Sequence, residues 1–201
     1  MQENGLKALI WRGFRVKTTD SDHLYGYAPN RLPGRTVDRV NQVWVTDITY
    51  IRIEGGFVYL ACVMDLFTRK IVGHALSDRL ESKLCIEALN HAIRSRKPLP
   101  GLIHHSDRGS QYCSHAYRKQ LQQFGMQASM SRKGDCWDNA PIESFFKTLK
   151  VECIYQQSLK TREEAKLVIF DYIETFYNRQ RKHSGLNYLS PMNYELAAVN
   201  S

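Results

Sequence analysis

Residues 43–76 of the chain, VWVTDITYIRIEGGFVYLACVMDLFTRKIVGHAL, decide its fold. Three runs rich in β-branched and aromatic residues, at 43–53, 57–66 and 70–76, predict β-strands. The turns between them, EGG and FTR, are short, and short turns favour antiparallel pairing. Both faces of the first run are largely apolar, so we expect this strand at the centre of the sheet.

The rest of the chain alternates between helical and strand-like patterns. The predicted elements are a helix at 81–96, a strand at 102–106, a helix at 114–124, a strand at 127–131 and helices at 141–153 and 161–177. The apolar stripe of the last helix ends in Tyr172, Ile173 and Phe176. A meander followed by βα units predicts an α/β fold, with a mixed five-stranded sheet and helices on both faces.

The composition indicates a folded, basic protein. The chain has 201 residues, 43% of them hydrophobic, and a net charge of +8. This charge favours a polyanionic partner, nucleic acid first, although a soluble protein can also be basic without such a partner. Five scattered cysteines without a CxxC motif argue against a disulfide scaffold or a zinc ribbon and fit a reducing cytoplasm. No apolar run is long enough to span a membrane, so no membrane partner is expected.

The first 40 residues differ from the others. They carry seven Lys/Arg against four Asp/Glu, and glycines and prolines interrupt any long periodicity. We expect a short helix near residues 3–9 and then an extended basic connector, which is either a solvated arm or a segment that follows a nucleic acid. The sequence is therefore divided into a basic arm at 1–40 and a folded domain at 41–201 that ends in a helical extension.

Three carboxylates stand out for their positions in this pattern. Asp47 lies in the first predicted strand, Asp107 directly follows the fourth, and Glu143 lies in the first turn of a helix. Each has a plain structural alternative: bonding to nearby backbone, forming a turn, and complementing the helix dipole. Together they would form an oxygen-rich site that suits Mg²⁺ or Mn²⁺, and paired ions of this kind cut and join phosphodiesters. A further acid, Asp65, is interpreted as a turn residue.

The helix at 141–153 has two distinct faces. Its apolar residues form a stripe that would face the core. Glu143, Lys147 and Lys150 share another face, so the two lysines either hold phosphates beside the carboxylate or form an ordinary solvated surface.

With these motifs the chain resembles the catalytic subunit of bacterial insertion-sequence transposases of family three, the second-frame product OrfB. The core of that family is similar to retroviral integrases. With 59 residues between Asp47 and Asp107 and 35 between Asp107 and Glu143, the acids match the family's DDE pattern. The family's sequence blocks are resembled by NQVWVTDITYI (41–51), VMDLFTRKIVGHALSD (63–78), HHSDRGSQY (104–112), SRKGDCWDNAPIESFFKTLKVECI (131–154) and YNRQRKHSGLNYLSPMNYE (177–195).

This resemblance implies an RNase H-like, retroviral-integrase-like fold and metal-dependent DNA cleavage and strand transfer at insertion-sequence ends. Residues 41–201 would then be the integrase-type DDE catalytic domain, and 1–40 the remnant of a DNA-binding region. Asp47, Asp107 and Glu143 would be the catalytic residues and the ligands of Mg²⁺ (or Mn²⁺), with two ions about 3.5–4 Å apart when DNA is bound. The candidate DNA-binding residues are Lys147, Lys150, Arg132, Lys133, Trp137, Arg179, Arg181 and Lys182.

The expected partners follow from the same resemblance. They are double-stranded DNA, as transposon ends and target, and the first-frame product OrfA, or a fusion with it, because the family has a longer N-terminal region. A homodimer or larger assembly on DNA, in the cytoplasm and associated with the nucleoid, is expected. Two other functions stay open: a non-catalytic DNA-binding protein that keeps the fold, and an RNase H-like nuclease that cuts hybrids or junctions.

Overall fold

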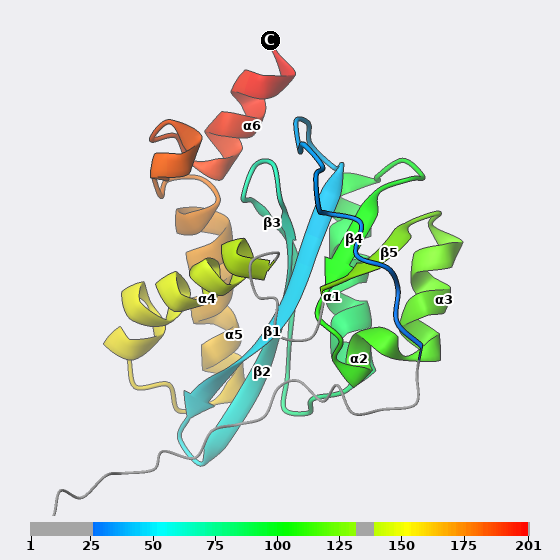
Figure 1. Ribbon diagram of the computed structural model, residues 1–201. Coiled ribbons are helices and arrows are strands. Elements are labelled where there is room, and N and C mark those ends of the chain that lie inside the picture. Colours follow the sequence, from blue (N-terminus) through cyan, green and yellow to red (C-terminus); the bar gives the residue numbers. More distant parts are fainter. Residues whose placement is uncertain (1–25, 132–138, 201) are drawn as a thin grey trace, which may run out of the picture.

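The computed structural model describes residues 26–131 and 139–200, and its centre is a single mixed sheet (Figure 1). The strands are β1 (Val43–Ile53), β2 (Gly56–Asp65), β3 (Ile71–Ser77), β4 (Ile103–Ser106) and β5 (Gln127–Met130). Their order in the sheet is β3-β2-β1-β4-β5. The first three strands pair antiparallel, while β4 and β5 run parallel to β1. The predicted meander and the central position of β1 are therefore confirmed.

Helices cover both faces of this sheet. They are α1 (Ser82–Arg96), α2 (Ser110–Cys113), α3 (His115–Gln123), α4 (Ala140–Glu152), α5 (Arg162–Asp171) and α6 (Pro191–Val199). Short turns of other helix types occur at η3 (Ile154–Gln156), η4 (Tyr172–Tyr177) and η5 (Ser184–Leu186). The predicted helix at 3–9 lies outside the described residues. In the described ranges, no helix has the length and apolar character needed to cross a membrane.

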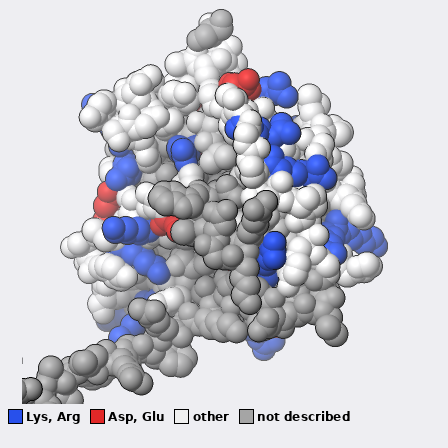
Figure 2. All heavy atoms as spheres, viewed as in Figure 1, with Lys and Arg blue, Asp and Glu red and all other residues white. Residues whose placement is uncertain are grey.

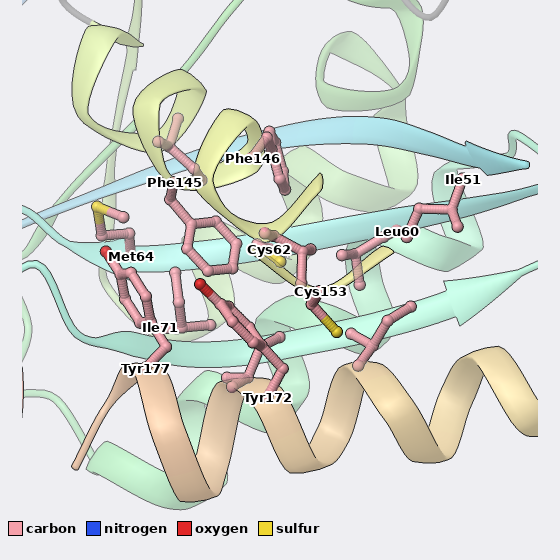
Figure 3. Packing of buried hydrophobic residues seen from close by; sticks show 14 of the residues in the cluster. Ile51, Leu60, Cys62, Met64, Ile71, Phe145, Phe146, Cys153, Tyr172 and Tyr177 are labelled. Atoms are coloured by element: carbon pink, nitrogen blue, oxygen red, sulfur yellow. The ribbon is translucent and has the colours of Figure 1, made fainter. Parts of the chain in front are cut away.

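Alternation along β1 assigns its side chains to two separate cores. Val43, Val45 and Ile51 pack with α4, α5 and η4 on one face. Trp44 and Ile48 pack with α1 and α3 on the other. Figure 3 shows the first core, where aromatic side chains of α4 and η4 meet residues of β2. Because successive residues of a strand point to opposite faces, Asp47 shares the face of Val45 and Ile51, on which α4 lies.

The helix predicted at 161–177 changes type near its end. From Tyr172 it becomes a π-helix, in which the Asn178 N–H donates to the Ile173 carbonyl at 3.0 Å. The wider turn adds a residue to the helical period and shifts the buried face by one position. Tyr177 is consequently buried at 3% exposure, whereas Phe176, placed in the apolar stripe by the sequence pattern, is 40% exposed.

Both outer strands of the sheet have backbone or side-chain partners. Beside β5, the Arg31 N–H donates to Ser129 Oγ at 2.9 Å, and Arg31 Nε donates to the Ala128 carbonyl at 3.2 Å. At the start of β3, the Asn178 side chain bonds both the N–H of Ile71, at 2.9 Å, and its carbonyl, at 3.0 Å. The described part of the basic arm is therefore held against the sheet at Arg31.

Candidate active site

The parallel pairing of β1 and β4 brings two of the three predicted acids together. Val45 is in register with His105. Continued by two residues, this register sets Asp107, the first residue after β4, level with Asp47. Asp47 Oδ1 accepts the Ile48 N–H at 2.8 Å, and Asp107 Oδ1 accepts the Gly109 N–H at 2.8 Å. Each carboxylate is thus oriented by a backbone donor close to it in sequence.

The third acid comes from α4. Glu143 lies in the first turn of this helix, after Pro141 at its start. The helix is anchored by buried Ile142, Phe145, Phe146 and Leu149, as the sequence predicts. On the polar side, Lys150 Nζ lies 4.5 Å from the centre of the Tyr50 ring, which shows that this side of the helix reaches β1.

The charges of Asp107 and Glu143 both act on Asp47. Burial, followed by the charges of Asp107 and Glu143, raises the pKa of Asp47 to about 8, against the opposing effects of the Ile48 N–H and Lys150. Burial lowers the pKa of Lys150, while the charge of Asp47 acts in the opposite direction. Asp47 therefore lies where negative charges converge, and a bound cation would relieve the repulsion.

The donor set fits a hard divalent cation, because carboxylate oxygens are the ligands that Mg²⁺ and Mn²⁺ prefer. Across residues 26–131 and 139–200, however, no three His, Cys, Asp or Glu side chains are arranged so that they could already hold a metal ion. The acids are gathered in one region of the fold but do not form a finished coordination cage.

The predicted DNA-contacting residues have different surroundings. Lys147 is exposed on α4, and Arg179 and Lys182 are exposed after η4. Arg181 makes an ion pair with Glu152, with Arg181 Nε and Nη2 both 2.8–3.0 Å from the carboxylate. Arg132, Lys133 and Trp137 lie outside the described residues. In Figure 2, Lys and Arg outnumber Asp and Glu on the face shown.

Other polar residues near the strand ends have structural partners. Asp65 is fully buried and accepts bonds from the N–H groups of Asn41, Phe67 and Thr68, which confirms its interpretation as a turn residue. His104 is buried, and its Nε2 lies 3.1 Å from the Tyr117 hydroxyl. Burial lowers the pKa of His104 to about 3, so its ring is neutral at neutral pH.

The sequence pattern did not single out Gln111, which lies beside Asp107. Its Oε1 is buried and has no hydrogen-bond partner among the described residues. A Cβ added to Gly109 would lie 3.0 Å from Asp107 Oδ1 and 3.1 Å from Gln111 Oε1, so both oxygens surround this glycine. The motif HHSDRGSQY contains Gln111 and could have pointed to it. It was missed because α2, which positions Gln111, begins four residues before the predicted helix.

Comparison with known proteins agrees with this architecture. Two family models, both described as "Integrase core domain", match residues 37–136 and 143–198. The IS600 uncharacterized 31 kDa protein of Shigella sonnei is 50% identical, over 90% of this chain and 66% of that protein. The transposase for insertion sequence element IS904 of Lactococcus lactis is 51% identical, over 77% of this chain and 61% of that protein. Transposase InsF for insertion sequence IS3A of Escherichia coli is 46% identical, over 77% and 54%.

Solved structures show the same fold at low sequence identity. A chain of the simian T-cell lymphotropic virus intasome superposes with a TM-score of 0.67 at 15% identity, over 89% of this chain and 61% of that chain. The catalytic core domain of BIV integrase superposes with a TM-score of 0.58 at 14% identity, over 80% and 97%. The sheet is therefore the RNase H-like, retroviral-integrase-like sheet that the sequence predicts.

The fold and the gathered acids define an α/β protein of the integrase-core class. Within it, the chain belongs to the family of insertion-sequence transposases that includes the IS3 and IS904 proteins. It spans 66%, 61% and 54% of the length of the three relatives named above.

Proposed function

We propose that this chain is the catalytic subunit of a DDE transposase, which cleaves DNA strands and transfers them at insertion-sequence ends in a metal-dependent reaction. One observation carries the proposal. The parallel register of β1 and β4 sets Asp107 level with Asp47 on an integrase-type sheet. The helix α4, which carries Glu143 in its first turn, packs on the face of β1 to which Asp47 belongs. Relatives named as transposases support the same reaction class.

Each acid has a defined role in this proposal. Asp47, Asp107 and Glu143 would hold the divalent ions, and Gln111 Oε1 would accept a hydrogen bond from a water of the same site. When bound, Mg²⁺ or Mn²⁺ supplies Lewis-acid stabilisation of the attacking and leaving oxygens. Lys147 and Lys150, on the face of α4 that carries Glu143, would bind backbone phosphates and position the strand.

The same proposal covers partners and domain organisation. The substrate would be double-stranded DNA, in agreement with the net charge of +8. A first-frame product or a fused N-terminal region would read the element's end. Residues 1–40 would belong to a DNA-binding region that precedes a catalytic domain at 41–201. A homodimer or larger assembly would hold two DNA ends; the HTLV-2 integrase core, a structural neighbour, is described in dimeric and trimeric forms with magnesium.

The test is a cleavage and strand-transfer assay on an element-end duplex in Mg²⁺ and Mn²⁺. The variants Asp47→Asn, Asp107→Asn and Glu143→Gln each keep the size of the side chain but remove its charge. We expect each to reduce both reactions to background while DNA affinity stays within a few fold. The exposed-acid variant Asp78→Asn is the matched control and should react as the unaltered chain does.

The assay also separates the two other functions. Salt-sensitive DNA binding by the unaltered chain without cleavage in either metal would favour a non-catalytic DNA-binding protein. Preferential cutting of an RNA–DNA hybrid would favour a nuclease. Wild-type cleavage by the triple variant would refute the assignment of the acids.

A further inference from the structure

A pocket of about 670 Å³ lies beside the start of α4, on a side of the helix different from that of Glu143. Its walls are the first turns of α4, the end of η4, the turn between β2 and β3, and the loop that contains η5. We call it the tail pocket. It is lined by Arg69, Ser144, Tyr177, Arg181, Lys182 and His183, among others.

The tail pocket carries positive charge that the described residues do not balance. Three cationic side chains line it, and none of the described lining residues is Asp or Glu. Arg181 is already paired with Glu152 outside the lining. Within the part of the chain that the structure describes, Arg69 and Lys182 have no ion pair. Arg69 is half-buried, and burial lowers its pKa. An anion in the pocket would therefore offset the free-energy cost of desolvating this guanidinium.

His183 adds a ring nitrogen, Nε2, that could bond a ligand in the pocket. Its Nε2 is buried and has no hydrogen-bond partner among the described residues. The ring is held edge-on against Tyr177, with centroids 5.0 Å apart and planes at 84°. Burial lowers the pKa of His183 to about 4, and the charges of Arg181 and Arg69 act in the same direction. The ring is therefore neutral at neutral pH and has one N–H to donate to an anionic oxygen.

The pocket is close to the proposed reaction centre. Ala140, Pro141 and Ser144 line it, and they belong to the same first turns of α4 as Glu143. Neighbouring residues of a helix are separated by about 1.5 Å along its axis, and neighbouring nucleotides of a DNA strand by about 3.4 Å. Because the pocket and Glu143 lie on different sides of α4, the width of the helix, about 10 Å, also separates them. A strand whose reacting phosphate lies at Glu143 would reach the pocket by passing around the start of α4, over about three nucleotides.

We propose that the tail pocket binds one backbone phosphate of the DNA strand held at the acidic site, through Arg69, Lys182 and the Nε2–H of His183. The proposal rests on the proposed function for the identity of the strand. The phosphate is a single shared anion for two cations and one neutral donor, which accounts for both the unbalanced charge and the unpaired nitrogen. Of the three cations predicted after η4, only Arg181 and Lys182 line the pocket, and Arg181 is held by Glu152.

The first experiment measures the salt dependence of binding to an element-end duplex, without divalent metal, by fluorescence anisotropy. The variants are Arg69→Gln, Lys182→Gln and the double variant, with exposed Lys166→Gln on α5 as the matched control. Loss of one phosphate contact should lower the slope of log K against log salt by about 0.9. We expect this decrease in the double variant, with roughly tenfold weaker binding at fixed salt, and no change in the control. A slope and affinity equal to those of the unaltered chain would overturn the proposal.

The second experiment uses inorganic phosphate and the His183 ring resonance in NMR spectra. Phosphate, and separately the duplex, should shift this resonance in the unaltered chain but not in the double variant, while the His91 resonance stays constant. No shift with the duplex would overturn the proposal. Because neither experiment needs cleavage, a chain that binds DNA through this pocket but never cuts it would refute the proposed function alone. Normal cleavage with an unchanged salt slope in the double variant would refute the pocket alone. Lys182 is exposed, so its replacement tests the pocket even if Arg69→Gln fails to fold.

Discussion

Asp47 combines burial with two like charges, and both conditions act on its pKa. It lies on the central strand, and Asp107 and Glu143 both raise its pKa, which reaches about 8. Without metal, the folded protein consequently holds a proton on Asp47 that the unfolded chain releases near its ordinary value of 3.8. Metal binding should displace this proton, so affinity for Mg²⁺ should increase with pH up to about 8.

The same linkage predicts how Asp47→Asn changes stability. Because the pKa is higher in the folded state, the folded state binds more protons between pH 4 and 8, and stability falls as pH rises through this window. An uncharged amide at this position would remove this loss of stability at high pH. In EDTA, we expect the variant to be more stable than the unaltered chain by on the order of 2 kcal/mol at pH 8, with the difference vanishing near pH 4. Urea unfolding at several pH values measures it, and a difference independent of pH would contradict the assignment.

At the scale of elements, the contact of α1 with β3 depends on a glycine. A Cβ on Gly73 would lie 2.7 Å from Ala92 Cβ and would also collide with the Ala88 carbonyl oxygen of the same helix. Gly73 and the two alanines therefore let the helix lie directly on the strand backbone. The small residues at these three positions are a requirement of the packing.

Gly73→Ala should therefore destabilise the fold. We expect a loss of about 1–3 kcal/mol, the usual cost of overpacking a core. Gly56→Ala is the control, because nothing lies within 4 Å of a Cβ at that position. It should change the free energy of unfolding by no more than about 0.5 kcal/mol. Thermal and urea unfolding measure both, and equal stability of the two variants would contradict the packing argument.

The sequence predicted those elements whose signal is local. The pattern at 43–53 predicted β1 with its observed bounds, because a strand with two apolar faces has a continuous signal. The change to a π-helix at Tyr172 was not predictable from an apolar stripe, since periodicity assumes a constant helical turn. The helix α6 was missed as well, because only Pro191 among its residues is buried.

In the candidate site and in the tail pocket, too, only residues with a local sequence signal could be predicted. Spacing, strand position and the resemblance to the family's DDE pattern single out the three acids in the sequence, and their role as catalytic residues and metal ligands stays a prediction. Residues brought in by distant segments, such as Arg69 and His183 of the tail pocket, carry no signal in a single sequence because tertiary packing alone joins them. Gln111 could be predicted only in part: it lies in a recognised motif, but its position depends on α2, which the sequence pattern did not predict.

Over the whole molecule, one carboxylate connects the C-terminal helix α6 to the end of α1 and to the turn before β3. Glu195 of α6 makes ion pairs with Arg96, at the end of α1, and with Lys70, before β3, the latter at 2.9 Å. Burial acts to raise the pKa of Glu195, but these two partners lower it below its ordinary value. The Met192 N–H also donates to the Asn178 carbonyl at 2.9 Å, so α6 is fixed at several points.

We expect Glu195→Gln to lower the free energy of unfolding by about 3 kcal/mol at pH 7, because it leaves two cations without their anion. Because the folded-state pKa is lowered, the contribution is complete above the ordinary pKa of 4.5 and is lost as pH falls through the folded value. The variant and the unaltered chain should then converge in acid. Exposed Glu87→Gln on α1 is the control, and a deficit that persists at pH 3 would contradict the ion-pair origin.

The partners found at the two borders of the sheet limit how copies of this chain can associate. Arg31 occupies the margin of β5 and Asn178 that of β3, so neither border strand offers an unused ladder at these positions. These bonds oppose sheet-to-sheet extension, in which one molecule's strand continues the next molecule's sheet, at Ala128 of β5 and at Ile71 of β3. We therefore expect a multimer that brings two DNA ends together to use helical surfaces and loops, whose contacts can be rearranged while every strand stays in register.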